Sequence, residues 1–386
     1  MPSTPLKNLL YRIALPIMAP SPHKRMKHAC TGQPPNHLPY YDHLLVHHRV
    51  QGASLLLSDG QRTASVNTSL RVRNHIADEN TLYRVASITK MATALVTLMC
   101  VDDGLFALDA PIRPLLPDTD FSGCLEGMTV RQLLCHTSGM RDHDMDIALR
   151  NNASFDDAIS KGNHIFFRPG ERMEYSNLGF GMLGCILENV TGMCISDLFR
   201  VKLFEPLGMR ATLDASTLNE AEVMPISRVL PYREGSDVTI TRLGRMPLDK
   251  PDPLRHFGHT AGAMYTDAPS LARLLTLIGN GGEIDGKRLV SADMMAEMTR
   301  VQSSTPKRTY GLGLVLLNRP DISSRRLLGH QGFAYGCVDG AFIEEGTGRM
   351  VIFLNGGASE AREGKLGLVN RDVLTWALKR EMPSWG

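Results

Sequence analysis

Two short strand-like runs of hydrophobic and small residues in the first quarter of the chain predict a β-hairpin. Residues 53–57 (ASLLL) and 63–66 (TASV) have the composition of strands, and Asp59-Gly60 lies between them. Asp-Gly is favoured in the tight turn of a hairpin because both residues tolerate a positive φ. We therefore expect an antiparallel pair of strands at this point.

Strand-like runs return in the C-terminal third of the chain. They occupy residues 310–317, 335–344 and 349–355, and the four residues 345–348 (EGTG) form a hairpin-length connection between the last two. A final helix is predicted over about residues 366–382. Strands from both ends of the chain are expected to share one antiparallel sheet.

Between these strands, apolar residues recur at helical spacing. Met91, Leu95, Leu98 and Met99 form one apolar face on a predicted helix over residues 87–100. Because the spacing continues for several turns, this is the strongest helical pattern in the chain.

Two further helices have recognisable ends. One covers residues 130–135 and begins after Thr129, which can cap it. The other covers residues 178–190, with Asn177 near its start and Gly192 just after its end. The middle third of the chain is therefore expected to be mainly helical.

This order of elements predicts an α+β fold, with an antiparallel sheet flanked by helices and a mainly helical domain beside it. The expected division is an N-terminal extension outside the fold over residues 1–36, a sheet domain made of residues 37–110 and 256–386, and a helical domain over residues 111–255. A cleft between two such units is a common place for an active site.

The balance of charge narrows the classes of function. The 386 residues include 42 basic and 40 acidic side chains, the formal net charge is +2, and the two signs are mixed throughout. A nucleic-acid-binding protein would usually concentrate its basic residues on one face or in one stripe. We therefore expect a small-molecule partner and no nucleic acid.

The seven cysteines are expected to be free thiols. Their number is odd, and no two of them form a C-x-x-C pair. Disulfide frameworks and zinc ribbons need paired, closely spaced cysteines. The pattern favours buried thiols in a reducing compartment.

The N-terminal segment is a candidate signal for export. Residues 9–20 are mostly apolar and follow Lys7, as in a signal peptide, but Arg12 and Pro16 interrupt the run and no small-x-small cleavage site follows. The run is also too short to span a bilayer. We expect a cytoplasmic protein without a membrane span, and export by this segment is the alternative.

The motif SITK at residues 87–90 places Ser87 and Lys90 on one face of the predicted helix. A serine hydroxyl becomes a strong nucleophile when a base takes its proton, and a lysine amine can be that base if burial or another cation lowers its pKa. S-x-x-K also occurs at Ser21 and Ser304, in loop-like stretches. Only Ser87 opens a strong helix directly after a strand-like run, so it is the expected nucleophile.

A second candidate group is Tyr175-Ser176-Asn177, the only Y-x-N in the chain. A tyrosine close to a lysine ammonium loses its proton more easily, and it can then act as a base or an acid. An asparagine beside it can donate to a substrate carbonyl and accept from the lysine. The structural alternative is that Asn177 caps the next helix and Tyr175 packs beneath it.

A third candidate group is GHQG at residues 329–332, which includes His330 and is expected just before a strand. Its glycines would let a substrate lie close to the chain. A competing HFG at residues 256–258 lies in an irregular stretch. Gly332 instead leads into Phe333 and the predicted strand beyond it.

In this order, the three groups make the chain resemble the serine β-lactamase and penicillin-binding-protein-like family. It is most similar to the branch that contains class C β-lactamases, D-alanyl-D-alanine carboxypeptidases, D-aminopeptidases and related esterases. The resemblance covers about residues 40–380. The supporting stretches are residues 129–139 (TVRQLLCHTSG), 169–179 (PGERMEYSNLG), 206–209 (PLGM), 261–264 (AGAM) and 329–340.

The resemblance implies a site in the cleft between the sheet and the helical domain, and chemistry without a metal or an organic cofactor. It implies that Ser87 forms a covalent acyl-enzyme, that Lys90 accepts its proton, and that Tyr175 relays a proton to the leaving group. Asn177 would hold the substrate carbonyl. The backbone N–H groups of Ser87 and Phe333 would form the oxyanion hole.

The third group departs from the Lys-Thr-Gly of many β-lactamases. Lysine there offers a fixed charge to a substrate carboxylate, whereas His330, which with Gly332 would contact the substrate, is mostly neutral at pH 7. The expected reaction is therefore hydrolysis of an ester or amide bond in a small molecule. A D-Ala-D-Ala-type carboxypeptidase, a β-lactamase or a transacylase is the alternative; Arg325 or Arg326 could supply the charge that a carboxypeptidase needs.

Other classes of function match less well. His136, Asp142, His143, Asp144 and Asp146 cluster in a short span, but they lack the spacing of a metal site, so we expect a solvated loop and no metal. A binding or sensor protein could keep the fold without turnover, but the chain retains all three candidate groups. It has no G-x-S-x-G, so an α/β-hydrolase is not supported.

Overall fold

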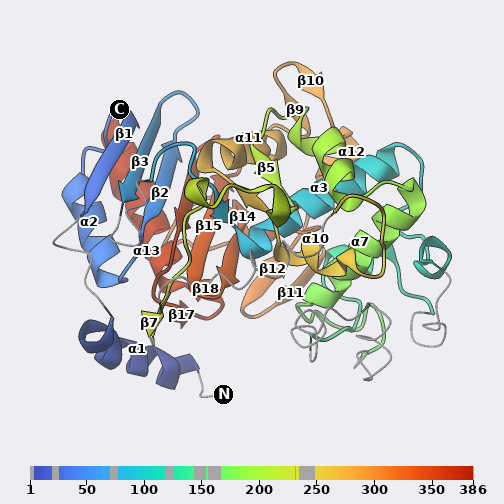
Figure 1. The fold of residues 1–386 in the computed structure, drawn as a ribbon, viewed down its shortest axis with the longest axis horizontal. Helices are drawn as coiled ribbons and strands as arrows, with labels where there is room; N and C mark the ends of the chain where they lie inside the picture. The colour runs from blue at the N-terminus through green and yellow to red at the C-terminus, as the bar shows by residue number, and fades with distance from the viewer. Residues whose placement is uncertain are drawn as a thin grey trace.

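A nine-stranded antiparallel sheet forms the centre of the computed structural model (Figure 1). The structure describes residues 4–19, 26–69, 77–117, 126–142, 154, 167–230, 232–233 and 248–385. In spatial order, the strands of the sheet are β1 (Lys27–Gly32), β3 (Thr63–Ser69), β2 (Ala53–Ser58), β16 (Met350–Asn355), β15 (Cys337–Glu344), β14 (Leu327–Ala334), β13 (Val315–Leu317), β12 (Arg308–Tyr310) and β11 (Ser303–Thr305).

The two ends of the chain meet in the middle of this sheet. β2 pairs with β16, with Ala53 opposite Asn355, and the predicted hairpin is the pair β2–β3. The expectation of one antiparallel sheet built from both ends of the chain is confirmed.

Helices lie on both sides of the sheet and form a separate group beside it (Figure 1). The helices are α1 (Thr4–Met18), α2 (Leu38–His47), α3 (Thr89–Asp102), α4 (Val130–Leu134), α7 (Asn177–Thr191), α8 (Ile195–Phe199), α10 (His259–Gly262), α11 (Ala268–Gly279), α12 (Ala292–Thr299) and α13 (Leu368–Trp376). Short helical turns that matter for the site are η2 (Ala86–Ile88) and η7 (His256–Gly258). The smaller strands are β4 (Tyr83–Arg84), β5 (Ala211–Thr212), β6 (Arg228–Val229), β7 (Tyr232–Arg233), β8 (Tyr265–Thr266), β9 (Glu283–Ile284), β10 (Lys287–Arg288), β17 (Arg362–Glu363) and β18 (Leu366–Gly367).

Apolar side chains cover both faces of the sheet. On β2, Leu55 and Leu57 belong to the core shared with α2 and α13, whereas Leu56 belongs to the core shared with α3, α7 and α11. Successive side chains of a strand point to opposite faces, so a strand that is covered on both faces reads as a continuous apolar run. This explains the unbroken run at residues 55–57.

The helix that carries Lys90 is enclosed by the rest of the fold. Every side chain of α3 from Thr89 to Cys100 is buried. α7, α10, α12 and β14 all pack against it. A helix that is buried on all sides holds its side chains in fixed positions, which suits a residue that must stay aligned with another.

Two predicted strands differ in detail from the structure. The run over 310–317 is two strands, β12 and β13, because the chain turns at Gly313, whose φ is +65° and where a Cβ atom would lie 2.8 Å from the Lys90 carbonyl oxygen. The GHQG group does not precede a strand but lies inside β14, with His330 opposite Ala341 on β15. Its two glycines weaken the strand pattern, and this is why the sequence did not reveal β14.

The sequence predicts that residues 1–36 form an extension outside the fold, but part of this segment belongs to the fold. β1 pairs with β3 at the edge of the sheet, with Cys30 opposite Val66. Most of β1 is exposed, so it lacks the apolar alternation that would have predicted it. α1 is also attached, because Asn8 donates to the backbone oxygen of Arg362 at 2.5 Å and accepts from its backbone nitrogen at 3.0 Å.

Among the described residues, no single helix is long and apolar enough to cross a membrane. The consecutive helices Asn177–Thr191 and Ile195–Phe204 meet that requirement only together, as a pair bent by 88°.

Candidate active site

Ser87 lies on the tight turn η2 that links β4 to α3. The residue before it, Ala86, has a φ of +46°, which is uncommon for a residue with a side chain. β14 lies directly against this turn, since a Cβ atom at Gly332 would be 2.4 Å from the Val85 carbonyl oxygen. The sequence predicted that the glycines of GHQG make room for substrate. That reason is wrong for Gly332 and for Gly329, because the protein's own backbone fills the space beside each of them.

Lys90 is completely buried beneath Ser87. Its Nζ lies 3.2 Å from Ser87 Oγ, 2.7 Å from Asn177 Oδ1 and 2.5 Å from the Ala261 carbonyl oxygen. Burial lowers the pKa of Lys90 to about 7, with the Asp142 carboxylate opposing the shift and the Arg308 guanidinium adding to it.

A neutral Lys90 would suit this environment. Its two N–H bonds can point to Asn177 Oδ1 and to the Ala261 oxygen, and both of these groups only accept. The lone pair of the amine is then left for Ser87 Oγ.

Tyr175 reaches the same serine oxygen from the other side. Its hydroxyl donates to Ser87 Oγ at 2.8 Å, and its ring lies 4.4 Å from the His136 ring, between centroids. Burial raises the pKa of Tyr175, so the phenol keeps its proton at neutral pH. The predicted easier loss of this proton beside a lysine is therefore wrong: burial disfavours the phenolate, and Lys90 itself is poised to be neutral.

Asn177 is oriented by Asp142, a residue that the sequence analysis placed in a solvated loop. The Asp142 carboxylate accepts from the Asn177 backbone nitrogen at 2.7 Å, from its side-chain Nδ2 at 2.8 Å and from the Leu178 nitrogen at 3.0 Å. This arrangement directs Asn177 Oδ1 to Lys90 and leaves one amide hydrogen for a substrate. The cap of α7 is Ser176, whose Oγ accepts from the Gly179 nitrogen, and not Asn177.

Of the alternative metal cluster, the structure describes only His136 and Asp142. His136 Nδ1 lies 3.3 Å from the Ser176 backbone nitrogen, and its ring supports Tyr175. His143, Asp144 and Asp146 lie outside the described residues.

His330 is buried on β14 with one ring nitrogen engaged. Its Nδ1 lies 2.7 Å from the Gln331 carbonyl oxygen, so Nδ1 carries the proton and Nε2 is an acceptor. Burial lowers the pKa of His330 to about 3, and the charge of Lys90 acts in the same direction. His330 is therefore neutral, as predicted from its residue type, and offers a lone pair.

The predicted site residues meet in one cleft with a volume of about 620 Å³. Ser87, Tyr175, Asn177, His330 and Phe333 line it, with Lys90 buried beneath Ser87 and Gly332 behind the nucleophile turn. This volume is in the range of small-molecule sites. The cleft is also lined by basic side chains that the sequence did not single out, among them Arg308.

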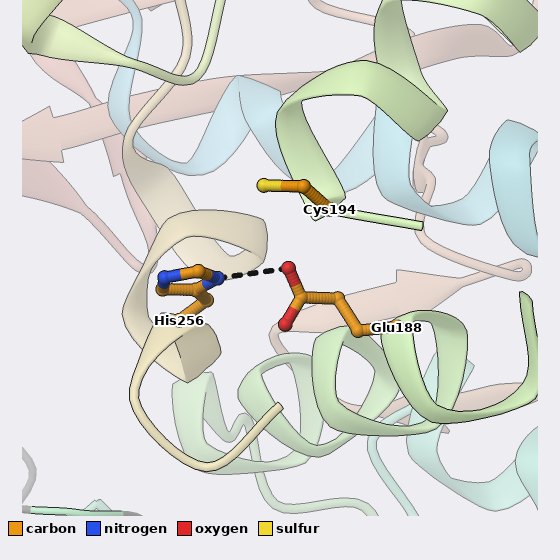
Figure 2. Close-up of side chains that lie close together, drawn as sticks. All are labelled: Glu188, Cys194 and His256. Carbon is orange, nitrogen blue, oxygen red and sulfur yellow. Dashed lines mark hydrogen bonds and ion pairs between the residues drawn. The ribbon is translucent and has the colours of Figure 1, made fainter. Parts of the chain in front are cut away.

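A second cluster of polar side chains is not among the residues that line this cleft. Figure 2 shows this cluster. Glu188, Cys194 and His256 are buried, and their potential ligand atoms lie within 4.8 Å of one another. The Glu188 carboxylate is already satisfied, because it pairs with His256 Nδ1 at 2.8 Å and accepts backbone N–H bonds from Ile195 and Asp252. The competing HFG group is thus part of a packing cluster between η7 and α7.

Comparisons with known proteins agree with this geometry. Residues 39–373 match the family model described as Beta-lactamase. Esterase EstB of Burkholderia gladioli is 28% identical over 336 residues, which are 77% of this chain and 82% of that protein. Penicillin-binding protein 4* of Bacillus subtilis (strain 168) is 30% identical over 141 residues, which are 34% of this chain and 30% of that protein.

The fold also matches solved structures. The D-amino acid amidase from Ochrobactrum anthropi SV3, complexed with L-phenylalanine, superposes with a TM-score of 0.71 at 23% identity and covers 88% of this chain and 95% of that one. The predicted α+β fold is confirmed by this likeness and by the antiparallel sheet with its flanking helices. The chain therefore belongs to the Beta-lactamase family, and it is a serine hydrolase with the fold of that family.

Proposed function

We propose that this serine hydrolase cleaves an ester or amide bond of a small molecule through an acyl-enzyme on Ser87. The observation that carries the proposal is the position of Ser87 Oγ, 3.2 Å from Lys90 Nζ and 2.8 Å from the Tyr175 hydroxyl, in an open cleft. The relatives named as an esterase and an amidase break the same two kinds of bond.

In the first step, Ser87 Oγ attacks the substrate carbonyl carbon and its proton passes to the neutral amine of Lys90. Lys90 is the better base of the two neighbours, because its pKa is about 7 whereas burial keeps Tyr175 protonated. The oxyanion that forms would accept from the backbone N–H groups of Ser87 and Phe333, which the close approach of β14 to the nucleophile turn supports.

In the second step, the bond from the carbonyl carbon to the leaving group breaks. The leaving group takes the proton from Lys90 by way of the Tyr175 hydroxyl, and the acyl group stays on Ser87. Water then attacks the acyl-enzyme and gives its proton to the same base. The bond from the carbonyl carbon to Ser87 Oγ breaks, Ser87 Oγ takes this proton back, and the acid is released. Asn177 would hold the substrate carbonyl, and His330 Nε2 would accept from a substrate N–H or O–H group. Each proton transfer is assigned to a side chain, so no metal or organic cofactor enters the proposal.

The test is loss of the nucleophile. Ser87→Ala should abolish turnover of p-nitrophenyl esters and covalent labelling by a fluorophosphonate. Ser304→Ala removes the serine of a competing S-x-x-K on β11 and should leave both unchanged. Full activity of the Ser87 variant would refute the proposal.

A carboxypeptidase, a β-lactamase or a transacylase would use the same acyl-enzyme with a different leaving group or acceptor. A panel of p-nitrophenyl esters, D-amino-acid amides and nitrocefin, with and without an added amine or alcohol as acceptor, separates these reactions. We also propose that the protein is cytoplasmic and that the chain divides into a sheet domain and a helical domain at about residues 110 and 256.

A further inference from the structure

The cleft is lined by basic side chains that the proposed acyl transfer does not use. Lys307 and Arg308 come from the hairpin β11–β12, and Arg362 and Lys365 come from the hairpin β17–β18. The two hairpins lie near each other at the lower edge of the molecule in Figure 1 and line the same cleft. We call these four residues the basic rim.

The carboxylates of the described residues leave three of the four rim cations without an ion-pair partner. None of them forms an ion pair with Lys307, Arg308 or Lys365. Glu363 lines the cleft, but Arg319 and Arg371 hold its carboxylate. The other acidic lining residue, Glu174, makes no ion pair with a described residue.

The rim cations act on one another. Partial burial lowers the pKa of Lys365, and the guanidinium groups of Arg308 and Arg362 lower it further, whereas the charge of Glu174 opposes part of this shift. An anion that binds between these cations reduces the electrostatic repulsion between them.

Contacts connect Arg308 to the nucleophile through Tyr175. Its guanidinium carbon is 5.1 Å from the centre of the Tyr175 ring, and the Tyr175 hydroxyl is 2.8 Å from Ser87 Oγ. Arginine can bind a carboxylate through two parallel hydrogen bonds.

His330 cannot take over this role in the tautomer that the structure shows. Its Nε2 carries a lone pair, which repels a carboxylate, and its Nδ1 proton is held by the Gln331 carbonyl oxygen. The sequence-based alternative, Arg326, is engaged outside the cleft by Glu345. A negative group that enters the cleft would therefore meet Arg308.

We infer that the cleft selects esters or amides that carry a carboxylate several bonds away from the scissile carbonyl, and that Arg308 binds this carboxylate. The inference rests on the proposed function and names its class of substrate. It assigns to Arg308 the charge that the neutral His330 does not offer to a substrate carboxylate.

The experiment compares esters that differ only in charge. One pair places the carboxylate on the acyl side (p-nitrophenyl butyrate against mono-p-nitrophenyl glutarate). The other places it on the leaving-group side (methyl 3-(butyryloxy)benzoate against 3-(butyryloxy)benzoic acid). After correction for spontaneous hydrolysis, kcat/KM of the wild type should favour the charged member of at least one pair by about tenfold or more, and added salt should reduce this ratio.

Variants then assign the preference to a residue. Arg308→Gln should bring the ratio of the two kcat/KM values close to one, and Arg308→Lys should keep part of it. The ratio is measured within each variant, so a general loss of activity cancels. Arg326→Gln is the matched control, because it removes a guanidinium outside the cleft, and it should leave the ratio unchanged.

Two failures can be told apart. If both pairs show equal rates and Ser87→Ala is inactive, the inference about the carboxylate is wrong and the proposed function stands. If ester hydrolysis does not depend on Ser87, the proposed function itself is wrong. The wild-type ratio decides the first question even if the Arg308 variants fail to fold.

Discussion

At the scale of single residues, the geometry around Ser87 assigns different tasks to its two neighbours. Lys90 and Tyr175 both contact Ser87 Oγ, and burial favours the uncharged form of each. Burial therefore lowers the pKa of the lysine and raises the pKa of the tyrosine. The uncharged form of lysine is a base, and the uncharged form of tyrosine is an acid. One buried environment therefore prepares both halves of a proton relay.

The first prediction concerns pH. Lys90 must be neutral to accept the Ser87 proton, so kcat/KM should rise with pH, with an apparent pKa near 7, and then level off. Tyr175 should add no falling limb at neutral pH, because its pKa is raised. The measurement is kcat/KM for an uncharged ester from about pH 5.5 to about pH 9. A profile that is flat through pH 7 would contradict the assignment of Lys90 as the base.

The second prediction concerns the fit between β14 and the nucleophile turn. In Gly332→Ala, the added Cβ would start 2.4 Å from the Val85 carbonyl oxygen, so the strand and the turn must separate. We expect fluorophosphonate labelling of Ser87 to slow by about tenfold or more, because small displacements of reacting groups are costly.

The matched control for this substitution is Gly179→Ala on α7. A Cβ atom there would make only ordinary contacts, the nearest at 3.7 Å. Labelling of this variant should stay close to that of the wild type. Equal labelling rates for Gly332→Ala and the wild type would show that the contact has no part in positioning Ser87.

At the scale of helices and strands, buried ion pairs join elements that are distant in sequence. Glu188 on α7 holds His256 on η7 and caps the start of α8 through the Ile195 nitrogen (Figure 2). Burial opposes the charged imidazole, but the hydrogen bonds to Cys194 and Glu188 outweigh it and raise the pKa of His256 to about 9.

The third prediction follows from this pair. A pKa that is raised from 6.5 to about 9 on folding means that the pair stabilises the fold fully below about pH 6.5 and loses that contribution as pH rises through about 9. Urea unfolding should show a loss on the order of 3 kcal/mol between these pH values in the wild type. His256→Gln should be less stable at low pH and should lack this part of the pH dependence. An equal pH dependence in both proteins would rule out the charged pair.

Most of the site residues could be predicted from short sequence motifs within single elements. The others are recognised only from contacts between elements in the structure. Ser87, Lys90, Tyr175 and His330 lie in short motifs, so the sequence indicated them, and the structure brings them together. Asp142 reaches Asn177 across 35 positions without any motif. Its function as the orienting carboxylate depends on tertiary structure alone, and its acidic neighbours in sequence suggested a loop or a metal site instead.

The same reasoning explains the elements that the sequence missed. Arg308 lies in a polar hairpin whose sequence resembles a surface turn. Only the tertiary packing of this hairpin against the cleft places Arg308 beside Tyr175. β1 is an exposed edge strand, and β14 contains two glycines, so neither shows the apolar alternation of a strand. The central strands β2, β15 and β16 are buried on both faces and were correctly predicted.

At the scale of the whole molecule, the N-terminal helix is connected to the basic rim. The two hydrogen bonds between Asn8 and the Arg362 backbone attach α1 to the β17–β18 hairpin. Gln331 holds the other strand of this hairpin, because it donates to the Lys365 oxygen and accepts from the Gly367 nitrogen.

The fourth prediction tests this connection. Asn8→Ala removes both hydrogen bonds to Arg362, so we expect a weaker preference for the charged ester of the responsive pair, by about two- to fivefold, and an unchanged rate of Ser87 labelling. Asn219→Ala is the control: it deletes a comparable side-chain cap, to the Ala221 nitrogen, at an exposed turn. If Asn8→Ala and Asn219→Ala behave alike, α1 does not position the rim.

The location of the basic rim on two short hairpins has a consequence for how the enzyme could change over evolution. The base Lys90 lies in the buried helix α3, and the nucleophile Ser87 lies on the turn just before it, so almost any substitution there disturbs several neighbours. Of the rim residues, Lys307 and Lys365 lie in exposed turns, and Arg308 and Arg362 are half-buried at the strand ends next to those turns, where substitutions are more readily tolerated than in a buried helix. One or two substitutions in the basic rim could thus change the substrate selectivity, in evolution or by design, while Ser87, Lys90 and Tyr175 stay unchanged.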